Sequence, residues 1–205
     1  MVVGGVKYRD KVNRDIDSMI DMVELKTERL ILRQWHQNDL TDFAALNADS
    51  EVMKFFSYTM NKKESDELAE KIISRMNNNG WGFWAVETIS DHVFIGFVGL
   101  NKPSYDVPVD PCVEIGWRLA KQYWGQGYAT EAAKAALAFA FNKLELCEVY
   151  SFAAVGNQRS RAVMERLNMV NTSISFQHPM MPENSKHKEH VLYKIDRKQW
   201  LEKQV

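Results

Sequence analysis

The segment from Trp117 to Glu131 carries the clearest chemical signal in the chain: a strand-like run, two glycines and the start of an alanine-rich helix. Gly125 and Gly127 allow a tight turn, and the missing Cβ atoms let a ligand approach the backbone N–H groups closely. These groups converge at the helix start, where unpaired donors and the positive dipole end suit a phosphate oxygen. The residue types therefore predict a diphosphate site made of main-chain groups, without a basic side chain.

Closely spaced glycines also occur in three different settings. A bare G-x-G can simply be a tight connection between a strand and a helix. A dinucleotide-binding turn needs a third glycine where this chain has Thr130, and it belongs to the first strand–helix unit of a parallel sheet. A Walker loop needs G-K-[ST], which the sequence lacks. The flanking elements have to decide between these possibilities.

The elements around the loop predict a mixed sheet. Strand patterns fall at residues 29–34, 81–87, 93–100, 113–119, 148–153, 172–176 and 191–195, and helix patterns at 40–46, 64–76, 129–141 and 158–167. The 129–141 helix repeats apolar residues three and four apart, so that one stripe faces a sheet. Helices alternate with strands only in the second half. This order predicts an α+β (α/β) fold with a mixed, mostly antiparallel sheet of about seven strands.

At this point the loop resembles a known motif. Gln122-x-x-Gly125-x-Gly127 is similar to the Q/R-x-x-G-x-G/A pyrophosphate loop of the GCN5-related N-acetyltransferases, the GNAT superfamily. Residues 123–132 look especially like the branch of ribosomal-protein N-terminal acetyltransferases, RimJ and RimL. Residues 27–33, 113–117 and 191–193 resemble that branch's opening, fourth and last strands. The resemblance runs from near residue 25 to residue 200, which leaves residues 1–21 as an N-terminal extension of unknown role before a domain at 22–205.

The resemblance implies a GNAT fold, with helices on both faces of a twisted sheet whose strands splay near an acetyl-CoA cleft. It implies acetyl-CoA as co-substrate, no metal, and an amine as acetyl acceptor. The residues that it places at acetyl-CoA are backbone groups of Trp117 and Leu119, the loop residues Gln122, Gly125, Gln126, Gly127, Tyr128, Ala129 and Thr130, and the side chains of Asn157 and Ser160.

Asn157 and Ser160 stand three residues apart at the start of the predicted helix at residues 158–167, so they share a face with Met164. The resemblance implies that the Asn157 amide bonds the pantetheine arm and that the Ser160 hydroxyl reaches toward the thiol. Both residues are also common simply as helix caps. Met164 occupies the position at which many relatives carry a tyrosine that protonates the thiolate, so that role is vacant or passes to Ser160.

Glu114 is the candidate general base. An alkylammonium with a pKa of about 10 is almost wholly protonated at neutral pH, so acyl transfer to an amine needs a group that takes the proton. Strand alternation points Glu114 away from Val113, Ile115 and Trp117. A carboxylate that is partly desolvated beside a cleft gains a raised pKa and can act directly or through water. A solvated strand carboxylate is the alternative.

Bulk properties narrow the partners. The chain has 26 basic and 27 acidic residues, a net charge of −1, so no global field favours nucleic acid or an anionic membrane. No apolar run reaches the ~18 residues that span a bilayer, no secretory core is present, and the two cysteines fit neither a zinc pattern nor a disulfide framework. We therefore expect a cytoplasmic protein, a monomer or homodimer, without nucleic-acid or membrane partners. The five histidines show no metal-ligand spacing.

The sequence thus predicts an acetyl-CoA-dependent N-acetyltransferase that acts on a primary amine. The vacant tyrosine position leaves a non-catalytic acyl-CoA-binding module as the alternative, and an enzyme that uses another phosphate-bearing ligand, such as a nucleotide, as a weaker third hypothesis. The loop at residues 177–189 and the aromatic residues Trp35, Phe55, Phe56 and Tyr58 are candidates to line the acceptor side.

Overall fold

The computed structural model describes residues 23–202, so the predicted extension at 1–21 lies outside the described residues. Helices and strands follow in the order β1 (Leu25–Lys26), β2 (Leu30–Arg33), α1 (Asp39–Ala48), α2 (Lys62–Asn79), β3 (Phe83–Thr88), β4 (Phe94–Asn101), β5 (Glu114–Leu119), the 3-10 turn η1 (Lys121–Tyr123), α3 (Tyr128–Asn142), β6 (Glu148–Ala154), α4 (Gln158–Arg166), β7 (Val170–Gln177), β8 (Glu189–Asp196) and α5 (Arg197–Glu202).

The strands form one eight-stranded sheet in the order β1-β2-β3-β4-β5-β6-β8-β7. All neighbours pair antiparallel except β5 and β6, which are parallel and are joined by α3. The prediction of a mixed, mostly antiparallel sheet is confirmed. The eighth strand is β1, whose two residues are too short to give a periodic signal in the sequence.

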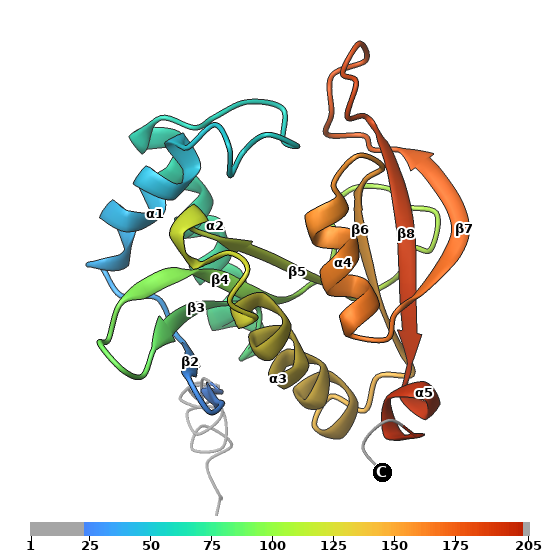
Figure 1. Cartoon of the computed structure of the whole chain (residues 1–205), viewed down its shortest axis with the longest axis horizontal. Coiled ribbons are helices and arrows are strands. Elements are labelled where there is room, and N and C mark those ends of the chain that lie inside the picture. Colours follow the sequence, from blue (N-terminus) through green and yellow to red (C-terminus); the bar gives the residue numbers. More distant parts are fainter. Residues whose placement is uncertain (1–22, 203–205) are drawn as a thin grey trace, which may run out of the picture.

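Helices cover both faces of the sheet. Neighbouring residues of β3 point to opposite faces: the Trp84 ring meets Phe139 of α3, whereas the Phe83 ring meets Phe97, which in turn contacts Phe43 of α1. Helix α1 packs against α2. Figure 1 shows α3 and α4 on the near side of the sheet and α2 behind it.

The parallel pair β5–β6 opens almost at once. Glu114 and Tyr150 are its one pair in register, the Tyr150 N–H donates to Val113 O at 3.0 Å, and the Ser151 hydroxyl donates to Ile115 O at 2.9 Å. Beyond Ile115 the two strands share no further ladder bond within the described part of the chain, although β5 runs on to Leu119. The expected splay therefore lies in the middle of the sheet, as Figure 1 shows by the wedge between β5 and β6.

Local sequence sets the ends of helix α2 on the far face of the sheet. Asn61 and Glu64 form a reciprocal capping box at the start of α2, and Gly80 ends the helix in the left-handed conformation with φ 75°. The sequence pattern predicted this helix at residues 64–76; the structure adds two residues at its start and, at its end, residues 77–79, whose composition is turn-like. Among residues 23–202 no helix has the length and hydropathy that a bilayer span needs.

Candidate active site

The glycine loop lies where β5 hands over to α3. Gly125 and Gly127 take φ values of 75° and 84°, in the left-handed region that favours glycine, and Gly127 is the N-cap of α3. No side chain of the described residues caps this helix start. The prediction that both glycines are needed for a tight turn at a helix N-terminus is confirmed in its geometry.

The main-chain donors of this loop are open. Within residues 23–202, no backbone or side-chain acceptor pairs with the N–H groups of Gly125, Gln126, Gly127, Tyr128, Ala129 or Thr130; the first paired amide is Glu131, which donates to Gly127 O at 3.0 Å. Six successive donors therefore stand at the positive end of a fifteen-residue helix. Such an array suits two adjacent phosphates. Gln122 contributes its carbonyl, which accepts a 2.9 Å bond from the Gln126 side chain and so tightens the turn.

A carboxylate inside the helix anchors the loop to the sheet. Glu131 accepts hydrogen bonds from the Thr27 hydroxyl (2.6 Å) and from the N–H and Nε of Arg29 (2.9 and 2.7 Å). Arg29 also donates to Gln126 O at 3.1 Å and lies over the Tyr128 ring at 4.5 Å. These bonds, with the Arg29 charge, outweigh partial burial and lower the pKa of Glu131. The sequence shows Glu131 only as part of the glycine-loop motif, and its bonds to Thr27 and Arg29 cannot be predicted from local patterns.

The open edge of β5 presents further backbone groups. The Ala120 N–H donates to Ile95 O on the β4 side, and Ile115 O faces Ser151 on the β6 side. Because successive peptide groups alternate across a strand, the N–H groups of Trp117 and Leu119 point toward β6, where the ladder has ended. The Leu119 carbonyl on this edge accepts a 2.8 Å bond from the Trp124 indole. Trp117 and Leu119 are thus placed at the wedge that leads to the glycine loop.

Helix α4 forms the other wall of the wedge. The Asn157 side chain accepts a 3.2 Å hydrogen bond from the Ser160 N–H, which makes Asn157 the N-cap, as its residue type predicted. Met164 is 1% exposed and lies in the core, so this position offers no group to a thiolate. Arg159 stacks over the Trp124 ring at 4.4 Å and links α4 to the glycine loop. No hydrogen bond joins Ser160 to Glu114 in the described part of the chain.

Glu114 begins β5 and is 9% exposed. Its Oε1 accepts a 2.6 Å hydrogen bond from the Asn101 amide. Burial raises the pKa of the Glu114 carboxyl to about 7, against the opposing effects of the Asn101 hydrogen bond and the Arg75 charge. A carboxyl group with a pKa near neutrality can both accept and return a proton at physiological pH.

The loop between α1 and α2 contacts the loop between β7 and β8. The Ser57 hydroxyl, between α1 and α2, donates to Met180 O at 3.2 Å, and the Phe55 ring meets His187 at 4.9 Å. Met180 and His187 belong to the loop between β7 and β8. Of the four aromatic residues expected to line this region with residues 177–189, Phe55 makes such a contact. Trp35 instead lies in the core against Phe43 and Phe94.

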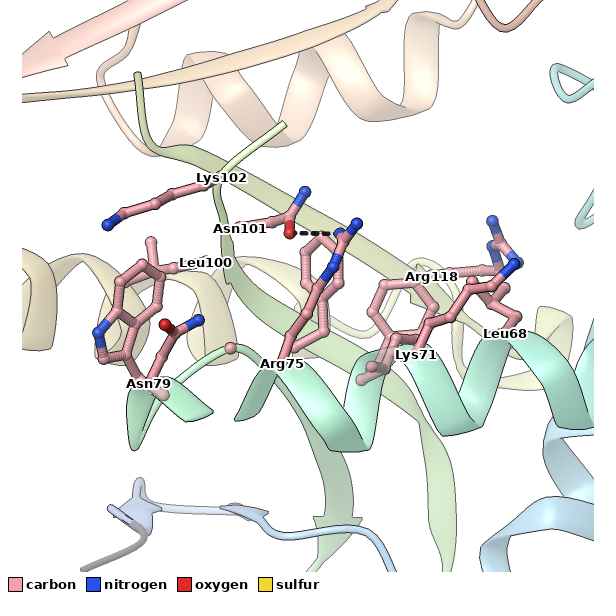
Figure 2. Close-up of a pocket in the computed structure, with 13 residues that line it drawn as sticks. Leu68, Lys71, Arg75, Asn79, Leu100, Asn101, Lys102 and Arg118 are labelled. Atoms are coloured by element: carbon pink, nitrogen blue, oxygen red, sulfur yellow. Dashed lines mark hydrogen bonds between the residues drawn. The ribbon is translucent and has the colours of Figure 1, made fainter. Parts of the chain in front are cut away.

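A pocket with basic side chains around a largely apolar lining lies along α2, close to Glu114. Its volume is about 170 Å³. Figure 2 shows four basic side chains around it: Lys71, Arg75, Lys102 and Arg118. Sequence patterns did not predict this group. A strand arginine four residues after Glu114, and so on the same face, was the available signal.

With this geometry in view, comparisons with known proteins place the chain. The family described as "Acetyltransferase (GNAT) domain" matches residues 29–170. The chain therefore belongs to the GNAT acetyltransferases, a family that uses acetyl-CoA, and acetyl transfer from acetyl-CoA is the reaction that membership implies.

Individual relatives agree with the family. The chain is 30% identical over 167 residues to "FsC-acetyl coenzyme A-N(2)-transacetylase" from Aspergillus fumigatus, an alignment that covers 78% of this chain and 70% of the relative. Such names support an N-acetyltransferase.

Solved structures share the fold. A GNAT acetyltransferase from Bacillus anthracis superposes with a TM-score of 0.72 at 22% identity, covering 86% of this chain and 99% of that one. Spermidine N-acetyltransferase from Vibrio cholerae, in complex with CoA and spermine, superposes with a TM-score of 0.67 at 22% identity, covering 85% and 99%. At these identities the likeness establishes the fold.

Proposed function

We propose that this protein transfers the acetyl group of acetyl-CoA to a primary amine, by direct attack within a ternary complex. The observation that carries the proposal is the row of six amides, unpaired within residues 23–202, at the α3 N-terminus beside the open edge of β5. The diphosphate would be held by Gln122, Gly125, Gln126, Gly127, Tyr128, Ala129 and Thr130. The Trp117 and Leu119 amides would hold the pantetheine arm and the acetyl carbonyl.

Glu114 is the proposed base. The amine nitrogen attacks the thioester carbon, its proton passes to the Glu114 carboxylate directly or through water, and the C–S bond breaks to release the coenzyme A thiolate. The N–H groups on the free edge of β5 stabilise the negative oxygen that develops on the acetyl carbonyl. Rate acceleration comes largely from holding amine and thioester together.

Asn157 and Ser160 line the α4 side. Asn157 uses its Oδ1 as the helix cap, and its amide Nδ2 remains the group to bond pantetheine. With Met164 buried, Ser160 is the proposed donor for the departing thiolate. Removing the hydroxyl by Ser160→Ala then slows turnover without weakening acetyl-CoA binding, because the thiolate forms only during the reaction.

The alternative is an acyl-CoA-binding module without turnover, and the buried Met164 is the observation that favours it. For the acetyltransferase, four classes of acceptor amine are candidates. They are a protein N-terminus as in the RimJ/RimL-like branch, an amino acid, an amino sugar, and a polyamine such as the spermine bound by the Vibrio cholerae protein.

Calorimetry with acetyl-CoA tests the binding site, and release of free coenzyme A thiol with a panel of amines tests the reaction. The proposal expects both signals in the wild type. Binding without thiol release for any amine supports the binding module, and absence of acetyl-CoA binding removes the proposal.

A further inference from the structure

The pocket beside α2 gathers four cations. Lys71 and Arg75 come from α2, Lys102 follows β4, and Arg118 lies in β5. Figure 2 shows Lys71 and Arg118 at one end, Lys102 at the other, and Arg75 with Asn101 between them. Within residues 23–202, none of the four takes part in an ion pair.

Arg118 is the most unusual of them. It donates to the Asn47 side-chain oxygen at 2.6 Å and lies over the Phe56 ring at 4.1 Å, while its Nε is buried without a hydrogen-bond partner among the described residues. Burial lowers the pKa of its guanidinium to about 10. Arg118 as a whole is half-buried, so the cost falls mainly on its Nε, because a buried donor without an acceptor is unfavourable.

Arg33, which is buried, shows how this fold pairs a guanidinium that is withdrawn from solvent. Arg33 holds Asp39 at 2.8 Å and Glu87 at 2.7 Å, so two carboxylates neutralise one cation. Arg118 has an amide and an aromatic ring instead. This difference indicates that the acceptor for the Arg118 Nε–H group comes from a bound molecule.

The pocket connects to the proposed base through one side chain. Asn101 accepts a 3.0 Å hydrogen bond from Arg75 and donates a 2.6 Å bond to Glu114. The positive charge of Arg75 acts on the Glu114 carboxyl and lowers its pKa, in opposition to burial. A molecule held by the pocket cations therefore lies one residue away from the carboxylate that would take its proton.

The diphosphate of acetyl-CoA has its own place elsewhere. The glycine loop leads into α3, which packs on the opposite face of the sheet from Phe83 and Phe97, and these two rings line the pocket. At about 170 Å³, the pocket is also smaller than the ~300–1,000 Å³ of typical drug-sized ligand sites. A small charged group fits it better than a cofactor.

We infer that the acceptor is a small primary amine that also carries an oxyanion, a carboxylate or a phosphate, which Lys71, Arg75 and Arg118 hold beside Glu114, while Lys102 adds positive charge at the other end of the pocket. This inference rests on the proposed function and names the substrate class of the same site. The oxyanion supplies the acceptor that the Arg118 Nε lacks, and it holds the amine near the base. A polyamine is disfavoured, because four fixed positive charges repel it.

Matched amine pairs test the inference. Each pair contrasts an anionic amine with a neutral analogue: an α-amino acid against its amide, and an O-phosphorylated amino alcohol against the free amino alcohol. Rates are compared per concentration of free amine, because the anion also changes the pKa of the amine. We expect kcat/KM for the better anionic member to exceed that of its neutral partner by about tenfold to a hundredfold, the usual size of a charge-assisted hydrogen bond. Which pair shows the larger ratio distinguishes carboxylate from phosphate.

Variants locate the effect. Arg118→Met and Arg75→Gln each bring the ratio toward one while leaving the acetyl-CoA Kd unchanged; Arg75 is exposed, so Arg75→Gln keeps the test open if Arg118→Met fails to fold. Lys134→Met, on the exposed side of α3, removes one positive charge away from the pocket and retains the wild-type ratio.

The outcomes separate this inference from the proposed function. Turnover with no preference for the anionic member, or with preference for a polyamine, overturns the substrate class and leaves the acetyltransferase in place. Missing acetyl-CoA binding, or missing thiol release with every amine, fails the proposed function itself.

Discussion

The glycine loop and the basic pocket both present hydrogen-bond donors that have no acceptor among residues 23–202, yet they are built by opposite means. The loop uses six consecutive main-chain N–H groups and a helix dipole. The pocket uses side chains that come from α2, the end of β4 and β5. The first site is a local property of a short segment, whereas the second exists only after the sheet and α2 have packed together.

The loop is the region where one substitution should weaken acetyl-CoA binding the most. Gly127→Glu forces a side chain into a φ of 84° and puts a carboxylate among donors that face a diphosphate. We expect acetyl-CoA binding to fall by about a hundredfold or more, that is by roughly 3 kcal/mol, measured by calorimetry.

Two further variants divide that loss between shape and charge. Gln126→Glu adds the carboxylate without a left-handed residue, and Lys134→Glu makes a larger charge change two helical turns away. If Lys134→Glu weakens binding as much as Gly127→Glu, a general charge effect and not the loop accounts for the loss.

Glu114→Gln tests the point at which the two regions meet. The substitution keeps the size of the side chain and removes the base, so we expect kcat to fall by about 10²–10⁴-fold, the usual contribution of general base catalysis. The acetyl-CoA Kd should stay at the wild-type value, because the glycine loop is untouched. A variant with normal kcat would show that Glu114 does not accept the proton.

The pH profile sharpens the same step. Because burial raises the pKa of Glu114 to about 7, the active carboxylate form is lost as the pH falls below about 7, and kcat/KM should fall with it. Asn101→Leu removes the 2.6 Å hydrogen bond that favours the carboxylate, so the acidic limb should move to higher pH. If the acidic limb of the Asn101→Leu variant stays at the wild-type pH, the limb does not report the titration of Glu114.

The contrast between the two regions accounts for what the sequence could predict. Gly125 and Gly127 need positive φ, and the helix after them repeats apolar residues at helical spacing, so the loop and α3 were visible in one short stretch of consecutive residues. Strand alternation likewise placed Glu114. The donors of the pocket were not visible, since Lys71 of α2 and Arg118 of β5 line the same pocket only once the chain has folded.

Anchoring residues were missed for a related reason. Thr27 and Glu131 are 104 positions apart, and nothing in either local pattern indicates that they bond. The two-residue strand β1 was missed because it is shorter than any period that a sequence pattern can display. Long-range pairing carries information that local propensity lacks.

Glu131→Gln gives the smallest expected effect and tests how the loop is held. Its folded-state pKa is lowered, so the ionised carboxylate stabilises the fold above its unfolded pKa of about 4.3, and this contribution is lost as the pH falls through the folded pKa. Because the Arg29 side chain is 44% exposed, solvent screens the ion pair, and we expect the variant to lose about 1 kcal/mol at pH 7.

Chemical denaturation at pH 7 and at pH 3 measures this difference. The gap between the unfolding free energies of wild type and Glu131→Gln should narrow at pH 3, because this pH lies below the unfolded pKa of Glu131, and the acetyl-CoA Kd should rise only slightly. A large rise in Kd with unchanged stability would instead mean that Glu131 orients the loop amides directly. The glycine loop would then depend on Glu131, which bonds Thr27 across 104 positions of the chain. Like the basic pocket, the loop would require residues that are distant in sequence.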